Sequence, residues 1–242
     1  YGRAADLPRN LTYVHLAGRL ANLVYSMGIT NTDFYPHQYK PLLTLLESPA
    51  NGILIADEVG LGKTIEAGLI WTELRARFDM RRLLVICPAM LREKWRDELL
   101  RRFGINATIL DAQGLLDELK KPRTATGEGQ AWVVSYQSVR PPKDWKTTKT
   151  ADVKKPTARR LLADLLDENA DNEPLVDMVI FDEAHYMRNR ESAAYTLGDL
   201  VRDTTDYLVL LSATPINLKN DDLFNLLKLT DPEHFRYPHD FA

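Results

Sequence analysis

Six short apolar runs, separated by longer amphipathic segments, most constrain the fold of this 242-residue chain. Continuous apolar runs are typical of strands that are buried on both faces of a parallel sheet. The segments between them, such as 64–78, 91–103 and 193–202, are long enough for the crossover helices that parallel pairing requires. The sequence therefore predicts an α/β fold in which a mostly parallel sheet carries helices on both faces. The predicted strands are Ile53–Ala56, Leu83–Cys87, Thr108–Leu110, Trp132–Ser135, Val176–Phe181 and Tyr207–Leu211.

Composition limits where in the cell the chain is expected and which partners it can bind. Hydrophobic residues make up 45% and charged residues 27%, the balance of a soluble globular protein. No run approaches the roughly 20 apolar residues that span a bilayer, and residues 1–10 contain no signal-peptide core, so we expect a cytoplasmic protein without a membrane partner. The net charge of −3 means that any nucleic-acid binding must be local. The single cysteine, Cys87, lies in an apolar run and is predicted to be a buried strand residue.

The chain is predicted to comprise an N-terminal helical extension at 1–33 and one α/β domain at 34–242. Apolar residues recur at helical spacing over Leu16–Met27, which predicts a helix in the extension. A second helix is expected at Pro41–Glu47, because proline is favourable in a first helical turn. The sequence begins at Tyr1 rather than at methionine, so we expect it to be a piece of a longer protein.

Two polar stretches, near 121–130 and 140–167, interrupt the alternation and are predicted to be surface insertions. The second is rich in cations. Phosphate contacts by such cations would weaken as salt rises. Charge runs on loops are more often simply solvated, so the sequence slightly favours a mobile, solvated loop. The cations are Lys143, Lys146, Lys149, Lys154, Lys155, Arg159 and Arg160.

A glycine-containing loop between the first predicted strand and the next helix carries the strongest chemical signal. Gly60 and Gly62 allow backbone N–H groups to approach phosphates, and the following helix N-terminus adds positive potential. Lys63 is suited to reach the β- and γ-phosphates of ATP, and the Thr64 hydroxyl to bind Mg²⁺. A simple turn between strand and helix would not explain the Lys63-Thr64 pair, because that pair has no packing role at this place. The strict phosphate-loop pattern has a glycine where this chain has Asp57. The loop reads Asp57-Glu58-Val59-Gly60-Leu61-Gly62-Lys63-Thr64.

An acidic pair, Asp182 and Glu183, directly follows the predicted strand Val176–Phe181. Ligands of parallel α/β folds bind at the carboxyl ends of the strands, where these carboxylates are expected to lie. Asp182 is suited to hold Mg²⁺, and Glu183 to orient or deprotonate the water that attacks the γ-phosphate. An acidic helix start, worth about 0.3–1 kcal/mol, would explain either carboxylate alone but not the phosphate loop upstream.

These motifs, in this order, resemble the superfamily-two helicase fold. The resemblance rests on DEVGLGKT, on the DEAH box at Asp182-Glu183-Ala184-His185, and on Leu211-Ser212-Ala213-Thr214-Pro215. The chain is most similar to the SWI/SNF-type translocases of double-stranded DNA, and DEVGLGKTIEAG to their bacterial RapA-like branch, in which Asp57 is normal. The resemblance spans Phe34 to Pro232. It implies a RecA-like P-loop domain, the first of two, with the second motor domain absent from this chain.

The resemblance also implies roles for individual residues. Gln38 matches the glutamine that recognises adenine, and it joins residues Asp57 to Thr64 in the expected ATP site. Ser212 and Thr214 match the motif that couples nucleotide state to DNA grip, with His185 as an intermediary. Taken singly, each of these residues also fits a structural role in a helix, core or turn. The residues that match DNA-backbone contacts are Pro88, Arg92, Trp95, Ser135 and Tyr136.

Three functions follow from the resemblance. The first is an ATP-dependent translocase on double-stranded DNA that displaces bound proteins, such as RNA polymerase, in a prokaryotic cell. The second places the same DNA-dependent ATPase in a bacterial anti-phage or restriction system, with defence-system subunits as partners. The third is a nucleotide-dependent DNA-binding module with little turnover by itself, because the second RecA-like domain of the parent protein would supply the arginines that speed hydrolysis.

Overall fold

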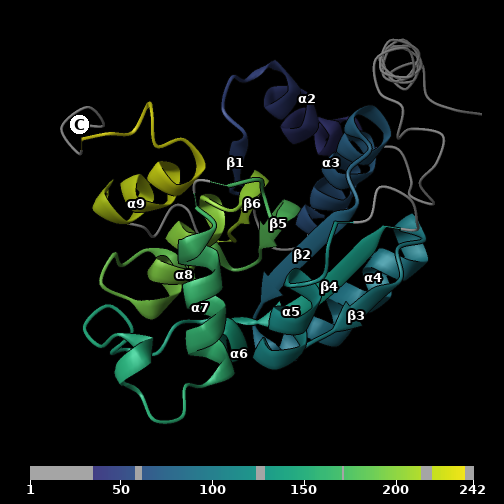
Figure 1. The fold of residues 1–242 in the computed structure, drawn as a ribbon. Helices are drawn as coiled ribbons and strands as arrows, with labels where there is room; N and C mark the ends of the chain where they lie inside the picture. The colour runs from purple at the N-terminus through teal and green to yellow at the C-terminus, as the bar shows by residue number, and fades with distance from the viewer. Residues whose placement is uncertain (1–34, 58–61, 124–128, 171, 214–219, 238–242) are drawn as a thin grey trace, which may run out of the picture.

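Six strands form one parallel sheet in the computed structural model, in the order β1-β6-β5-β2-β4-β3 (Figure 1). The structure describes residues 35–57, 62–123, 129–170, 172–213 and 220–237. Every pairing is parallel, which confirms the predicted α/β fold with its parallel sheet. The strands are β1 (Gly52–Ile55), β2 (Arg82–Cys87), β3 (Ala107–Ile109), β4 (Gln130–Ser135), β5 (Val176–Phe181) and β6 (Thr205–Leu211).

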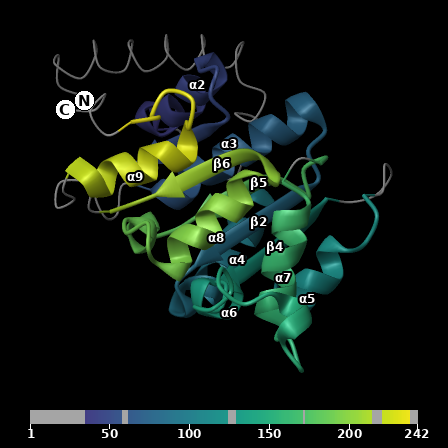
Figure 2. The ribbon, with the colours of Figure 1, turned by 60° about the vertical axis from the view of Figure 1, so that its left-hand side comes forward.

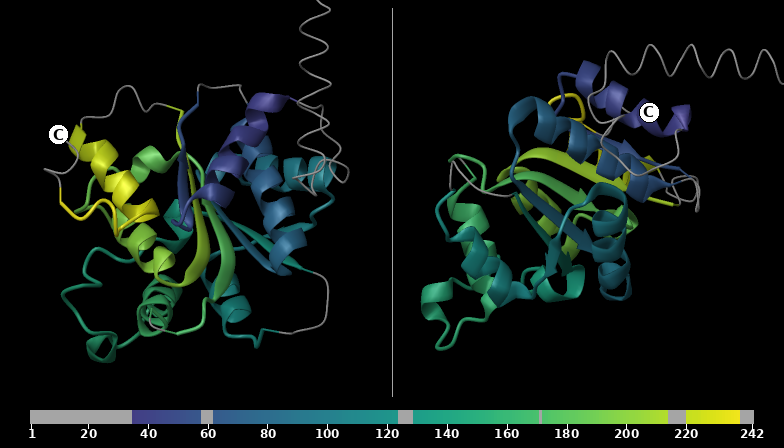
Figure 3. Two further views of the ribbon diagram at one scale, coloured as in Figure 1. Left: turned by 90° about the horizontal axis from the view of Figure 1, so that it is seen from above. Right: turned by 90° about the vertical axis from the view of Figure 1, so that its right-hand side faces the viewer.

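Helices cover both faces of the sheet, and Figure 3 shows the sheet between the two groups. One face carries α2 (Lys40–Glu47), α3 (Lys63–Phe78) and α4 (Arg92–Phe103). The other carries α5 (Ala112–Leu119), α6 (Tyr136–Val139), α7 (Ala158–Glu168), α8 (Ala193–Arg202) and α9 (Asn220–Thr230). Short 3₁₀ turns are η2 (Pro36–Tyr39), η3 (Ala89–Leu91), η4 (Thr150–Asp152) and η5 (Ala184–Met187). The helix predicted in the N-terminal extension lies outside the described residues.

Alternate side chains of the central strands supply two hydrophobic cores, one on each face. In β2, Leu84 and Ile86 point to the core under α5, α7 and α8, whereas Leu83 and Val85 point to the core under α3 and α4. Cys87 belongs to the second core and is fully buried, as predicted. Burial raises the pKa of its thiol to about 12, so the side chain packs as a small apolar group.

Local signals explain where several helices begin and end. Asp111 accepts a hydrogen bond from the N–H of Gly114 at the start of α5, and Ser192 accepts one from Tyr195 at the start of α8. Gly104 ends α4 in the left-handed conformation, with φ of 65°. No helix in the part of the chain that the structure describes is long and apolar enough to cross a membrane.

The start of β1 lies directly against the end of α9. A Cβ atom added at Gly52 would lie 2.2 Å from the main-chain oxygen of Thr230. Since main-chain atoms cannot rotate away, Gly52→Ala must separate β1 from α9, and we expect it to lower the free energy of unfolding by about 1–3 kcal/mol. Urea denaturation measures this. Gly114→Ala is the control, because its Cβ meets only the tip of Leu110 at 3.1 Å and alanine favours a helix. Equal stability of Gly52→Ala and the parent would contradict the prediction.

Candidate nucleotide site

The carboxyl ends of four neighbouring strands bring the predicted motifs to one edge of the sheet. Ile55 of β1 pairs with Leu211 of β6, and Phe181 of β5 pairs with Leu210 of β6. The main chain beyond the strands stays in register, because the N–H of Ser212 donates to Ile55 O at 3.0 Å. Asp57, the acidic pair and Ser212 therefore follow neighbouring strands at the edge where such sheets bind ligands.

Gly62, the last residue of the phosphate loop before α3, has a backbone conformation that favours glycine. Its φ is +97°, and an added Cβ would lie 2.4 Å from Nε2 of Gln38. The buried Gln38 amide, carried by η2, thus touches the loop that begins α3. The structure brings these two predicted nucleotide-binding residues together, although 24 positions separate them in the sequence. Glu58, Val59, Gly60 and Leu61 lie outside the described residues.

Lys63 and Thr64 occupy the first turn of α3. The Lys63 ammonium donates a hydrogen bond to the main-chain oxygen of Asp57 at 2.7 Å, so it spans the two ends of the loop. Gly62 O accepts the N–H groups of Ile65 and Glu66 and so starts the helix at this point. The first turn presents the positive end of the helix dipole, together with a lysine and a hydroxyl, which suits an anionic phosphate.

Asp182 is held from several directions. Its Oδ2 accepts a hydrogen bond from Trp95 Nε1 at 2.8 Å, and its Oδ1 accepts the N–H of Glu183 at 2.9 Å. The Tyr136 hydroxyl donates to the main-chain oxygen of Asp182 at 3.0 Å. Burial, aided by the charge of Asp182, raises the pKa of Tyr136 well above its usual value, so this donor stays protonated. Trp95 and the Glu183 N–H therefore fix the orientation of the carboxylate, while Tyr136 holds the main chain of the same residue.

Glu183 has a left-handed backbone, with φ of 55° and ψ of 49°. This conformation costs a non-glycine residue about 1–2 kcal/mol, and such strain is concentrated at functional sites. The Glu183 side chain lies beside His185, with 3.1 Å between Oε2 and Nδ1. The His185 ring stacks on Tyr186 at 4.7 Å between ring centroids. The turn thus places a carboxylate and an imidazole next to each other at the end of β5.

The structure describes two of the three predicted coupling residues, Ser212 and His185. Ser212 follows β6 and is 1% exposed. Its hydroxyl has no hydrogen-bond partner within the described part of the chain, so it is available to a group brought to this edge. Thr214 lies outside the described residues. The roles of Ser212, Thr214 and His185 in coupling stay predictions.

Most residues predicted to contact DNA lie inside the protein. Trp95, Ser135 and Tyr136 are all less than 5% exposed. Trp95 and Tyr136 bind Asp182, and the Ser135 hydroxyl caps α6 by accepting the N–H of Ser138 at 3.2 Å. Pro88 is also buried, whereas Arg92 is half-buried and donates to Ala89 O at 3.2 Å. Trp95 and Tyr136 thus support Asp182 from inside the protein. Contact of the five predicted residues with DNA stays a prediction.

Glu66 is a buried carboxyl that the sequence analysis did not single out. It lies on the first turn of α3 with 0% of its surface exposed. Burial, followed by the nearby Asp57 carboxylate, raises its pKa to about 8, while Lys63 opposes the rise. A signal was present in the sequence, since Glu66 directly precedes the run Ala67–Trp71, which is buried throughout.

The residues at this edge fit a magnesium ion that is held together with a nucleotide. Mg²⁺ is usually bound by one or two protein oxygens plus phosphates and water. Thr64 and Asp182 supply a hydroxyl and a carboxylate of this kind, and the described residues contain no cluster of three or more His, Cys, Asp or Glu side chains that would hold an ion by themselves. The donor set thus suits Mg²⁺ bound with phosphates.

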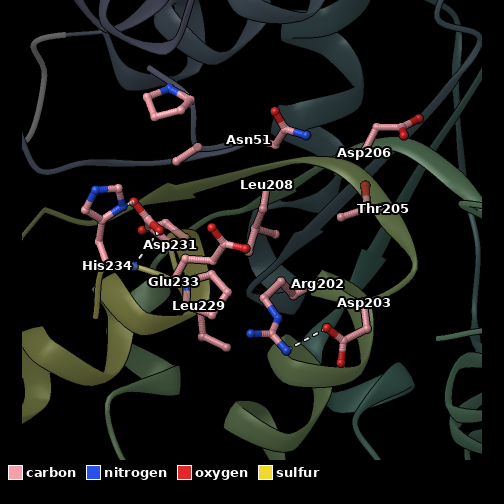
Figure 4. Close-up of a pocket in the computed structure, with 14 residues that line it drawn as sticks. Asn51, Arg202, Asp203, Thr205, Asp206, Leu208, Leu229, Asp231, Glu233 and His234 are labelled. Carbon is pink, nitrogen blue, oxygen red and sulfur yellow. Dashed lines mark hydrogen bonds and ion pairs between the residues drawn. The ribbon is translucent and has the colours of Figure 1, made fainter. Parts of the chain in front are cut away.

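Two hollows lie near the ends of β1. One, of about 600 Å³, adjoins Asp57 between α2 and β1 and is continuous with the nucleotide edge. The other, of about 550 Å³, lies at the amino ends of β1 and β6 (Figure 4). Among its lining residues, Arg202 lies against Asp203 and His234 against Asp231. The second hollow is therefore at the wrong edge of the sheet for the predicted ATP chemistry.

The parallel sheet, its two helical layers and the lysine-threonine loop at its carboxyl edge define a RecA-like P-loop domain. A comparison with protein-family models matches residues 37–242 to the SNF2-related domain. The chain belongs to the SNF2-related domain family. The predicted SWI/SNF-type assignment is confirmed.

Curated relatives place the chain near RapA within this family. RNA polymerase-associated protein RapA of Pseudomonas fluorescens is 27% identical over 237 residues, which cover 95% of this chain and 22% of the relative. RapA of Actinobacillus pleuropneumoniae serotype 5b is 30% identical over 230 residues, with coverage of 94% and 22%. The chain thus spans about a fifth of the length of these relatives. The predicted RapA-like character is confirmed.

Solved structures agree on the fold. The SWI2/SNF2 ATPase core of Sulfolobus solfataricus in complex with double-stranded DNA superposes with a TM-score of 0.58 at 18% identity. The match covers 88% of this chain and 39% of that one. A second structure, of the Sulfolobus solfataricus SWI2/SNF2 ATPase core domain, gives a TM-score of 0.57 at 18% identity, with coverage of 88% and 38%. At this identity, the similarity demonstrates the shared fold alone.

The raised pKa of Glu66 predicts a pH-dependent stability. Between its ordinary pKa of 4.5 and its raised value of about 8, the folded chain holds a proton that the unfolded chain has lost. The free energy of unfolding should therefore fall as pH rises through this window. Glu66→Gln, which keeps the shape without titrating, should flatten the fall. Urea denaturation at several pH values measures it, with exposed Glu191→Gln as the control. An identical pH profile for parent and Glu66→Gln would refute the prediction.

Proposed function

We propose that the chain is the ATP-binding half of a motor that uses ATP hydrolysis to move along double-stranded DNA. The observation that carries this proposal is the convergence of Gln38, Lys63 and the Asp182–Glu183 pair on one carboxyl edge of a parallel sheet. Membership of the SNF2-related domain family supports the use of a nucleotide at this edge. The domain limits, with an extension at 1–33 and a motor domain at 34–242, belong to the same proposal.

The residues divide the work of phosphoryl transfer to water. Gln38 contacts adenine, while Lys63 and the N-terminus of α3 bind the phosphates. Thr64 and Asp182 hold Mg²⁺, which neutralises charge on the β- and γ-phosphates when it is bound. Glu183 orients the attacking water and accepts its proton as the bond between the β- and γ-phosphates breaks. The hydrogen bonds from Trp95 and Tyr136 keep Asp182 in place during this step.

Duplex DNA and RNA polymerase are proposed as partners. The structural neighbour from Sulfolobus solfataricus is described in complex with double-stranded DNA, and the relatives are described as RNA polymerase-associated. These names favour displacement of RNA polymerase over the alternative of an anti-phage or restriction subunit. In the proposed motor, the second RecA-like domain of the parent protein closes the ATP site from the other side.

Two substitutions separate phosphate binding from hydrolysis. Lys63→Ala removes a charge-assisted contact and should weaken ATP binding by about 10- to 100-fold, because such contacts are worth about 1.5–3 kcal/mol. Glu183→Gln should keep ATP affinity within about twofold and abolish turnover in the full-length enzyme. Calorimetric titration with Mg·ATP measures the affinities, and Lys94→Ala on exposed α4 surface is the matched control. Equal ATP affinity for Lys63→Ala and the parent would exclude the phosphate-loop assignment.

The 242-residue chain alone should hydrolyse ATP very slowly. Arginines that a second domain inserts into such a site accelerate hydrolysis by about 10³- to 10⁵-fold. Two arginines of this chain have partners of their own, since Arg190 lies over the Tyr195 ring and Arg202 pairs with Asp203 at the amino edge. Steady-state ATPase assays with and without duplex DNA, beside the full-length parent protein, test this. Fast, DNA-stimulated turnover by the chain alone would contradict it and would remove the alternative of a binding module without turnover.

A further inference from the structure

A positively charged cavity of about 900 Å³ lies beyond the ends of β4 and β5. It is called the basic pocket here. The chain as a whole has a net charge of −3, so this concentration of positive charge is a local exception. One acidic residue, Glu191, lines it. The cations that line it are Arg140, Lys143, Lys146, Arg159 and Arg190.

The insertion that forms the basic pocket is anchored to α7. The Trp145 indole N–H donates to Asp164 at 2.8 Å. Arg160, only 3% exposed, forms an ion pair with Asp144 and donates to Thr148 O at 2.7 Å. Two helical residues thus hold the loop at three points. Lys143, Lys146 and Lys149 of this loop are exposed, as the sequence favours for a solvated loop, and its mobility stays a prediction.

These anchors also occupy the neighbouring acids. Asp144 is ion-paired with Arg160, whereas Asp164 accepts a hydrogen bond from the neutral Trp145 indole and keeps its charge; neither residue lines the pocket. Of the lining cations, Arg190 lies 5.9 Å from the centre of the Tyr195 ring. Within the described ranges, no ion pair to a carboxylate joins the other four. Cations that outnumber the one acidic lining residue, Glu191, create a positive potential that attracts an anionic ligand.

Helix direction adds to this potential. Both α7 and α8 begin at the basic pocket, with Arg159 in the first turn of α7 and Ser192 capping α8. The N-terminal ends of these helices carry partial positive charge. Figure 2 shows α6, α7 and α8 as neighbours on one face of the sheet, and their contacts agree. The pocket therefore combines side-chain cations with two helix termini.

The basic pocket lies at the same edge of the sheet as the candidate ATP site. The chain reaches it directly from β4 through α6, and from Glu183 through η5 and residues 188–192. Both routes start at the carboxyl ends of strands, the edge that carries the candidate ATP site. A ligand in the pocket would thus lie at the same carboxyl edge of the sheet as the bound nucleotide.

We propose that the basic pocket binds the phosphate backbone of duplex DNA and extends the DNA track of the motor onto the 140–167 insertion. This inference rests on the proposed translocase function. Lysine and arginine side chains that line a rigid hollow suit a row of phosphates, which need no sequence-specific contact. An acidic protein segment is the rival ligand, and the experiment separates the two.

The test compares two triple variants that lose the same charge. The pocket variant is Lys143→Ala/Lys146→Ala/Arg159→Ala. The control variant is Arg75→Ala/Arg101→Ala/Lys120→Ala, which removes exposed cations near helix C-terminal ends at the opposite edge of the sheet. Fluorescence anisotropy of a short labelled duplex is measured over a range of KCl concentrations. Unchanged Mg·ATP affinity and thermal unfolding of both variants show that the fold and the nucleotide site are intact.

The pocket variant should make the negative slope of log affinity against log salt less steep by roughly 2–3, because each lost phosphate contact removes about 0.9 from its magnitude. The control variant should keep the parental slope. A third variant, Lys143→Arg/Lys146→Arg/Arg159→Lys, should restore it. If the parent binds duplex but the pocket variant keeps its slope, or both triples change equally, the inference fails and the proposed function stands. If the parent does not bind duplex, both fail.

Competition with a poly-glutamate peptide distinguishes the rival ligand. The peptide should displace duplex from the parent only at high peptide concentration. Tight peptide binding that the pocket variant loses, together with an unchanged duplex slope, would assign the pocket to an acidic protein segment and overturn the DNA assignment.

Discussion

Parallel pairing is the constraint on which the rest of the structure depends. Because all the strands end at one edge, segments that are far apart in the chain meet there without any long connection across the site. The pairings of Ile55 with Leu211 and of Leu210 with Phe181 set the depth at which each following residue emerges. A slip of β5 by one residue would turn Asp182 to the other face of the sheet. The two hydrophobic cores oppose such a slip, since every residue of β5 is buried.

Asp182 shows how the two layers of helices cooperate at this edge. Trp95 belongs to the core of one face, and Tyr136 to the core of the other, yet both donate hydrogen bonds to Asp182. The residue is therefore clamped by side chains that are themselves fixed by packing. A carboxylate held in this way needs little reorganisation for its proposed role in holding Mg²⁺ with a nucleotide. Glu183, the next residue, has a strained backbone, so the rigid and the strained positions are adjacent.

Sequence alone predicted the six strands and the order of the motifs, because these signals are contiguous or depend on strand ends. It did not predict what depends on distant contacts. Trp95 lies 87 positions from Asp182, and its indole gives no sign in the sequence that it will turn toward a carboxylate. Helices α5 and α9 were also not predicted. The length of α5 is only 8 residues, and Gly114 lies within it, which weakens its periodic signal.

The basic pocket and the acidic pair are joined by a segment with little freedom. Between them, η5 packs on α8 and α9, with Ala184 and Met187 fully buried, and Asn225 of α9 holds the main-chain oxygen of Arg188 at 2.8 Å. A phosphate bound at Arg190 would therefore contact the end of a well-packed segment rather than a loosely held loop. Glu183, the first residue of this segment, has a left-handed backbone that is costly for a residue other than glycine. The proposed DNA subsite and the proposed catalytic carboxylate thus lie at the two ends of one short, well-packed segment.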